Sequence, residues 1–189
     1  MVFTYRRTAI GCVAAFSSLV LLVVFASYDS LLAALPISVI LRPSTEERLK
    51  IPSIGVDAAI ERVALTPEGA MDTPDGPRNV GWYSLGPYPG EEGSAVIAGH
   101  RGWKNGKSAV FDNLDQLRIG DNIVVISAGG EEHTFVVQET RLYGRDSVVP
   151  EVFVSDEGRH LRLITCVGTW DPKLKSTDER LVVFAEAVL

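Results

Sequence analysis

One stretch of the chain decides the fold: Leu161-Arg162-Leu163-Ile164-Thr165-Cys166. It alternates apolar and mixed side chains and contains β-branched residues, a pattern that predicts a half-buried β-strand. Val167 and Gly168 follow directly, so we expect Cys166 at the carboxyl end of this strand. Reactive side chains are common at strand ends, because loops from other parts of a fold meet there. The stretch therefore predicts both a core strand and a candidate nucleophile.

Similar short runs recur on either side of this strand, separated by turn-forming Pro, Gly and Asp residues. We expect strands at Arg48 to Ile54, Ala58 to Leu65, Ser94 to Ala98, Asn122 to Ser127, His133 to Leu142, His160 to Thr165 and Leu181 to Val188. A short helix is expected only around Ser108 to Gln116. About eight strands with so little helix predict an all-β fold, a closed or nearly closed antiparallel barrel.

The length and charge limit the class of protein. A chain of 189 residues accommodates one folded domain and a short appendage. The net charge is -6, and no run of Lys and Arg is long enough to follow a phosphate backbone. Nucleic acid is therefore not an expected partner.

The N-terminal segment has the pattern of a membrane anchor. From Thr8 to Tyr28 there is no charged residue, and as a helix this run would span about 31 Å, the thickness of a bilayer core. A cleaved secretory signal is the alternative, but its apolar region is usually shorter. Arg6 and Arg7 precede the run and Asp29 follows it, which places the N-terminus in the cytoplasm and the rest outside.

These features divide the chain into four parts. Residues 1–7 are expected in the cytoplasm, and residues 8–41 form the anchor with an apolar, interfacial continuation interrupted by Pro36. Residues 42–48 are a polar linker, and residues 49–189 form the extracellular domain. The expected location is thus the cell membrane, with a single pass.

The cysteine count singles out one thiol. Cys12 lies inside the predicted anchor, so Cys166 is the one cysteine of the exported domain and no disulfide can form within that domain. An odd exported cysteine indicates either a functional thiol or a small buried apolar side chain. Both interpretations stay open on the count alone.

A nucleophilic cysteine needs a neighbour that stabilises its thiolate, and the chain offers three histidines. His160 lies six residues before Cys166 on the same predicted strand, roughly 20 Å away at ~3.3 Å per residue. His133 begins a strand after a polar turn, where an exposed position is expected. His100 ends the strand Ser94 to Ala98 in a glycine-flanked turn, and barrels bring such strand ends together. His100 is the preferred partner.

Acyl transfer also needs a group that stabilises the developing oxyanion, and Arg180 precedes the last predicted strand, where a fixed cation could serve. An ordinary surface arginine is the alternative.

Other chemistries fit less well. The run Gly102 to Ser108 is one residue short of a phosphate-binding loop, and the histidines lack the spacing of metal ligands. The acidic pairs at 91–92 and 131–132 could contact calcium but are typical of solvated loops. No metal and no cofactor is expected.

Three of these motifs together resemble the sortases, membrane-anchored cysteine transpeptidases of Gram-positive surfaces. Leu163-Ile164-Thr165-Cys166 is similar to the end of the family's active-site strand, with Arg162 in place of its usual first Thr. Ala98-Gly99-His100 resembles the family's Gly-His turn. Arg180-Leu181-Val182-Val183-Phe184-Ala185 resembles the strand that carries its arginine.

The resemblance implies an eight-stranded sortase-type β-barrel and a mechanism. The thiolate of Cys166 would attack the carbonyl after Thr in a Leu-Pro-x-Thr-Gly-like sorting signal, with His100 protonating the departing amine. Arg180 would position the signal and stabilise the oxyanion, and Thr165 would contact substrate. The partners implied are secreted proteins that bear the signal, and a cell-wall precursor or pilin amine that resolves the thioester.

The subclass stays open. No long lid precedes the barrel, which disfavours the usual pilus-polymerising type, and the chain looks closest to the small class D, E or F enzymes. A mainly hydrolytic sortase uses the same thioester. An L,D-transpeptidase would carry a Ser-x-Gly-Cys-like signature, which residues 164–168 lack. The remaining alternative is a non-enzymatic domain that binds the wall, with Cys166 simply buried.

Overall fold

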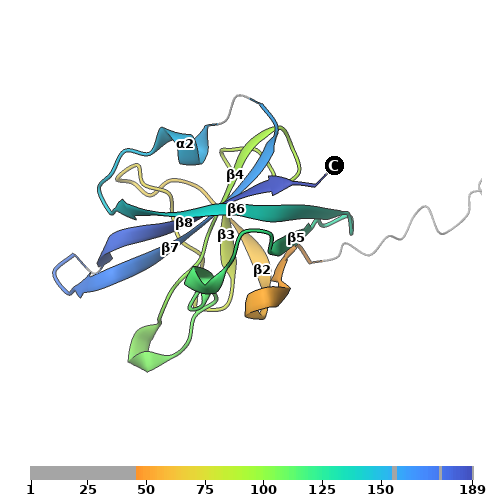
Figure 1. The fold of residues 1–189 in the computed structure, drawn as a ribbon. Coiled ribbons are helices and arrows are strands. Elements are labelled where there is room, and N and C mark those ends of the chain that lie inside the picture. Colours follow the sequence, from red (N-terminus) through yellow and green to blue (C-terminus); the bar gives the residue numbers. More distant parts are fainter. Residues whose placement is uncertain (1–45, 155–156, 175, 189) are drawn as a thin grey trace, which may run out of the picture. The chain divides into compact units, whose positions relative to one another are not determined.

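The computed structural model describes residues 46–154, 157–174 and 176–188 (Figure 1). The predicted anchor and most of the predicted linker lie outside these residues. In the described part of the chain, no helix has the length and apolar character needed to cross a membrane.

Eight strands close into a barrel, in the order β1-β2-β3-β4-β7-β8-β6-β5. The strands are β1 (Arg48–Ile51), β2 (Val56–Val63), β3 (Val80–Tyr83), β4 (Gly93–Ala98), β5 (Asn122–Ile126), β6 (Glu132–Gly144), β7 (Arg159–Asp171) and β8 (Ser176–Ala187). The predicted eight-stranded barrel is confirmed. It is not fully antiparallel, because β2 pairs with β3 and β4 pairs with β7 in parallel.

Several local predictions were wrong. The strand β3 was not expected, since Val80–Tyr83 is only four residues long and contains Gly81. The expected strand from Arg48 ends at Ile51, where a 3-10 turn, η2 (Pro52–Ile54), leads to Gly55 in the left-handed conformation at φ 69°. Proline cannot extend the strand pairing and glycine tolerates this φ, so the chain turns here.

The helical segments also differ from expectation. The region Ser108 to Gln116 forms turns that end in one 3-10 turn, η4 (Leu114–Gln116), rather than a helix. The carboxylate of Asp112 accepts hydrogen bonds from the backbone N–H groups of Gly102 (2.6 Å) and Ala109 (3.0 Å), which stabilises the turn conformation. A further 3-10 turn, η3 (Lys104–Gly106), precedes it. The α-helical turn α2 (Pro150–Phe153) was not predicted.

The strands β6, β7 and β8 are the longest of the barrel, and they lie side by side in Figure 1. Pairing between β7 and β8 continues to Asp171 and Ser176, with a register shift between Val167 and Trp170. The sequence pattern predicted Cys166 at the carboxyl end of its strand, but Cys166 lies within the strand. The strand is longer because β8 supplies a partner for residues whose own sequence does not alternate.

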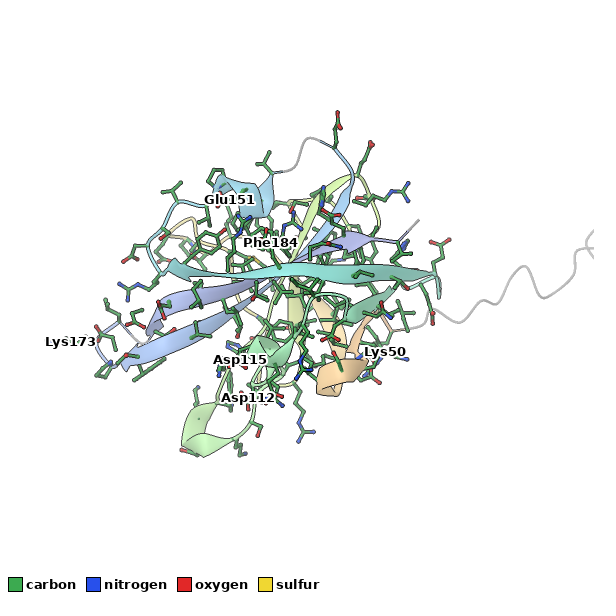
Figure 2. The ribbon with its side chains drawn as sticks, in the orientation of Figure 1. Lys50, Asp112, Asp115, Glu151, Lys173 and Phe184 are labelled. Carbon is green, nitrogen blue, oxygen red and sulfur yellow. The ribbon has the colours of Figure 1, made fainter. Side chains whose placement is uncertain are left out.

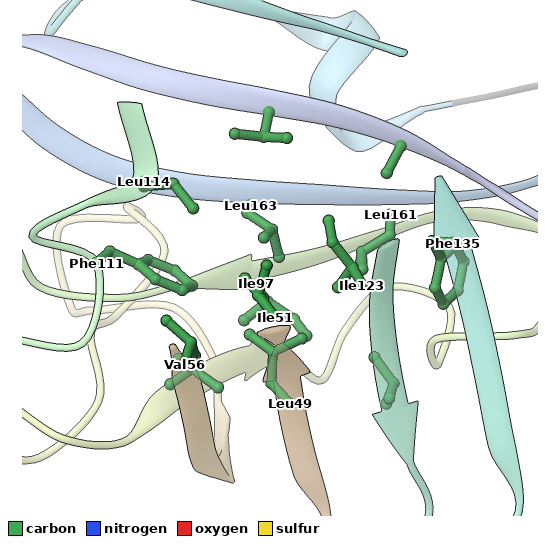
Figure 3. Close-up of a cluster of buried hydrophobic side chains, with 14 of the residues drawn as sticks. Leu49, Ile51, Val56, Ile97, Phe111, Leu114, Ile123, Phe135, Leu161 and Leu163 are labelled. Atoms are coloured by element: carbon green, nitrogen blue, oxygen red, sulfur yellow. The ribbon is translucent and has the colours of Figure 1, made fainter. Parts of the chain in front are cut away.

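Two apolar clusters hold the barrel together. The larger fills its interior with fully buried side chains from β1, β4, β5, β6 and β7, among them Leu49, Ile97, Ile123, Phe135 and Leu163 (Figure 3). The smaller lies on the other face of the sheet, under α2, and consists of Val96, Val152, Val182 and Phe184. The hydroxyl of Ser94 on β4 donates to the Val152 carbonyl at 2.8 Å, which fixes α2 against the sheet.

Candidate active site

Cys166 and Arg180 are direct cross-strand partners in the antiparallel pair β7–β8. Side chains of such a pair leave the same face of the sheet, with Cβ atoms about 4.5–5.5 Å apart. The next register position on this face holds Ile164 and Val182; Val182 belongs to the cluster under α2, and Ile164 packs against it. Cys166 is a free thiol and is partly exposed. Cys166 is therefore partly exposed and lies directly across the strand pair from Arg180.

The parallel pairing of β4 with β7 brings His100 to the other side of Cys166. Ala98 is the register partner of Ile164, and Gly99 continues the pairing by donating its N–H to the Ile164 carbonyl at 3.0 Å. Because β4 and β8 flank β7, the turn that carries His100 and the strand that carries Arg180 lie on opposite sides of the strand that carries Cys166.

The imidazole of His100 is held on two sides. Its Nε2 lies 3.1 Å from the Pro74 carbonyl, and its ring lies 4.8 Å from the Trp103 ring between centroids. Since a carbonyl oxygen only accepts, this contact requires the hydrogen on Nε2, and a neutral ring then has its free lone pair on Nδ1. Nδ1 is therefore the nitrogen available to exchange a proton with a reacting group.

Gly99 allows the turn before His100 to pack closely. A Cβ at this position would clash with the Phe111 ring and would lie 2.9 Å from Cγ1 of Val110. The next carbonyl, that of His100, accepts a hydrogen bond from the Phe111 N–H at 2.9 Å. The loop that follows β4 is thus pressed against the strand end, which fixes the backbone of His100.

The Arg180 side chain turns back along its own strand. Its Nη1 donates to the carbonyls of Thr177 (3.1 Å) and Glu179 (2.8 Å) and to the Thr177 hydroxyl (3.2 Å), and its Nη2 donates to the Ser176 hydroxyl (2.8 Å). Among the described residues, no carboxylate lies within ion-pair distance of this guanidinium. Its positive charge has no direct ion-pair partner among these residues, although it contributes, after Arg145, to lowering the pKa of the Asp146 carboxyl.

Thr165 has a structural contact that the sequence did not indicate. Its side chain is 2% exposed, and its hydroxyl donates to the Gly99 carbonyl at 2.8 Å. This hydrogen bond ties the active-site strand to the turn that carries His100. The substrate contact expected of Thr165 stays a prediction.

Arg162 is a further feature of this strand whose environment could not be read from the sequence. It is 8% exposed, lies 4.6 Å over the Phe184 ring and donates to the carbonyls of Leu161 (3.3 Å) and Ala185 (3.1 Å). Its Nε is buried without a hydrogen-bond partner in the described part of the chain. Burial lowers the pKa of this guanidinium.

The other two histidines have different surroundings. The Nε2 of His160 lies 2.6 Å from the Glu157 carbonyl, at the start of β7. The ring of His133 lies against Gly90, in a shallow pocket that Glu91 and Glu131 also line. Within residues 46–154, 157–174 and 176–188, no group of three His, Cys, Asp or Glu side chains is placed to hold a metal ion.

A cavity of about 740 Å³ is lined by residues 166–168 of β7 and by Thr177, Glu179 and Leu181 of β8, whereas His100 and Arg180 are not among its lining residues. Its lining includes Arg101, Asp115, Leu142 and Glu179, and Arg101 and Asp115 form an ion pair at 2.9 Å. Figure 2 shows Asp115, in η4, below the three long strands. A cavity of this size accommodates several residues of a peptide.

The family model of the sortase domain matches residues 49–188. The chain belongs to the sortase family. Sortases are cysteine transpeptidases, so the free thiol on β7 lies in a domain of matching chemistry. No curated protein shows significant sequence similarity to the chain.

Solved sortases share the fold of this sortase domain. Sortase C-1 from Actinomyces oris is 24% identical with a TM-score of 0.58, and the match covers 76% of this chain and 73% of that one. Sortase A from Corynebacterium diphtheriae is 23% identical with a TM-score of 0.58, covering 76% and 60%. The sortase D5 transpeptidase from Clostridium perfringens is 24% identical with a TM-score of 0.57, covering 76% and 79%.

Proposed function

We propose that this sortase is a membrane-anchored transpeptidase that cleaves a Leu-Pro-x-Thr-Gly-like sorting signal after Thr and transfers the protein to an amine of the cell wall. One observation carries the proposal: Cys166 on β7 is partly exposed and is the direct cross-strand partner of Arg180 on β8, while Gly99, the residue before His100, hydrogen-bonds to β7 from its other side. This arrangement has a nucleophile, a proton donor and a cation with no direct ion-pair partner among the described residues, the groups that acyl transfer requires.

The chemistry follows from these three groups. The thiolate of Cys166 attacks the Thr carbonyl, and the Arg180 guanidinium stabilises the negative charge that develops on the oxygen. His100 protonates the departing amine, which leaves a thioester on Cys166. An incoming amine then attacks the thioester, His100 accepts its proton, and Cys166 leaves as the thiolate, which restores the starting state.

The proposed partners follow from the two halves of this reaction. The first substrate is a secreted protein that carries the sorting signal, and the second is an amine of a cell-wall precursor, or of a pilin if the enzyme polymerises. The uncharged run at 8–28 supports a membrane location with the catalytic domain outside. No cofactor is needed for this chemistry.

Intact mass spectrometry tests the proposal. The full chain in detergent is incubated with a library of Leu-Pro/Ala-x-Thr-Gly peptides and a glycine-based amine, beside the Cys166→Ala variant. We expect an acyl adduct on the wild-type protein and an amine-linked product, neither of which forms with Cys166→Ala. Because that variant retains Cys12, it also controls for nonspecific acylation of thiols.

The same experiment separates the alternatives. An adduct that yields only free acid, even at high amine concentration, would identify a mainly hydrolytic enzyme. Equal adduct formation with Cys166→Ala would remove Cys166 as the nucleophile. If no peptide acylates the protein and the Cys166 thiol labels no faster than a free thiol at neutral pH, the non-enzymatic wall-binding domain becomes the better interpretation.

A further inference from the structure

The first two residues of β8 hold the terminal nitrogens of Arg180. The hydroxyl of Ser176 accepts from Nη2 at 2.8 Å, and that of Thr177 accepts from Nη1 at 3.2 Å. The Thr177 hydroxyl can do so because its own hydrogen is donated to the Glu179 carbonyl at 3.2 Å. Both hydroxyls thus act as oriented acceptors for a side chain that follows them on the same strand.

The hairpin that carries these hydroxyls is itself fixed by carboxylates. Oδ1 of Asp171 accepts from the backbone N–H of Lys173 at 2.8 Å and of Leu174 at 3.3 Å, which shapes the hairpin end where Figure 2 labels Lys173. Oδ1 of Asp178 accepts from the Thr169 N–H at 2.7 Å, across the register shift of β7. The two acceptor hydroxyls therefore lie on a braced segment rather than on a free loop.

The choice of acceptors matters for the charge of Arg180. Its four described hydrogen bonds go to two hydroxyl and two carbonyl oxygens, all of them neutral. A carboxylate would hold the side chain equally well but would offset its positive charge. Neutral acceptors orient the guanidinium and preserve the field that it exerts on Cys166, its cross-strand partner.

We infer that Ser176 and Thr177 are positioning residues for Arg180, the cross-strand partner of Cys166: they hold its guanidinium and leave its Nε hydrogen and one Nη2 hydrogen for the substrate oxygen. This inference rests on the proposed function for its effect on catalysis. Holding the long side chain in the folded state removes the entropy cost of ordering it in the transition state. Preorganised donors of this kind stabilise an oxyanion most strongly.

The kinetic test is a double-mutant cycle in the full chain. We expect Thr177→Val combined with Ser176→Ala to lower kcat/KM for the peptide about 10-fold, and Thr177→Ser to restore the contribution of that hydroxyl. In an Arg180→Ala background the same two substitutions should have no further effect, because there is no guanidinium left to position. Thr134→Val, on β6, is the matched control for loss of a strand hydroxyl.

A second readout needs no substrate. In a Cys12→Ala background, the rate at which Cys166 reacts with an anionic methanethiosulfonate is divided by its rate with a neutral one. This ratio reports the positive charge near the thiol, so Arg180→Ala should lower it. The paired Ser176→Ala and Thr177→Val variant should lower it part of the way.

The two readouts distinguish the possible failures. If the paired variant lowers the reactivity ratio but the wild-type protein forms no acyl adduct, the proposed function is wrong and the positioning role is retained. Suppose instead that the protein turns over the peptide. If the paired substitutions then lower kcat/KM equally in the wild-type and Arg180→Ala backgrounds, or leave the reactivity ratio unchanged, the positioning role is wrong and the proposed function is retained.

Discussion

Cys166 and Arg180 lie directly opposite each other across β7 and β8, although the turn of the hairpin separates them along the chain. The relationship is set by backbone register, which a single side-chain substitution does not change. Chemical roles can therefore be tested by substituting either residue while the strand pairing that aligns them is retained.

Arg180→Lys should lower kcat/KM about 100-fold with little change in thermal midpoint. A lysine ammonium has no planar fork, so it cannot keep hydrogen bonds to the hydroxyls of Ser176 and Thr177 and also reach the substrate oxygen. Steady-state kinetics with a signal peptide measure the effect, and Arg159→Lys at the exposed start of β7 is the control. Unchanged kinetics in Arg180→Lys would show that Arg180 is an ordinary surface arginine.

Thr165→Val should lower the free energy of unfolding by about 1–3 kcal/mol, because the buried Gly99 carbonyl loses its hydroxyl donor. Turnover should also fall, since Gly99 precedes His100. Thr165→Ser keeps the hydroxyl and should retain most of both quantities. Denaturant titration gives the stability, and equal losses in the Val and Ser variants would show that the methyl group, and not the hydrogen bond, is what matters.

Gly99→Ala should destabilise the domain by about 1–3 kcal/mol, because the new methyl group overlaps the Phe111 ring and crowds Val110. Gly129→Ala is the matched control, since its nearest neighbour would be Oγ of Ser127 at 3.6 Å. The difference in thermal midpoint between the two variants checks the prediction. A smaller shift for Gly99→Ala than for Gly129→Ala contradicts the close packing described for the turn.

Arg162→Met should leave the stability within about 1 kcal/mol of wild type or raise it. Methionine removes a buried guanidinium with an unpartnered Nε and still covers the Phe184 ring. Arg162→Ala should instead lose about 2–4 kcal/mol, because the volume above Phe184 is no longer filled. Denaturant unfolding of both variants decides the matter, and an equal loss in both would show that the charge itself stabilises the strand.

Much of the fold was accessible from local patterns. Alternating and β-branched runs predicted seven of the strands, and their number predicted the barrel that the structure confirms. The short strand Val80–Tyr83 was missed because four residues with a glycine carry too little periodicity. The parallel pairing of β4 with β7 was missed because the direction of pairing depends on how the chain crosses over, which no local pattern records.

For the candidate site, the sequence by itself determined which reactive groups are present: one thiol outside the predicted anchor, a histidine in a glycine-flanked turn and an arginine near the last strand. Those properties depend on residue type and local order, so they can be read from the chain. Only the tertiary structure decided that Arg180 lies opposite Cys166, that Thr165 ties down the Gly99 turn, and that Ser176 and Thr177 hold the guanidinium. These relationships depend on strand register, which is set by the packing of both faces of the sheet at once and not by any one segment.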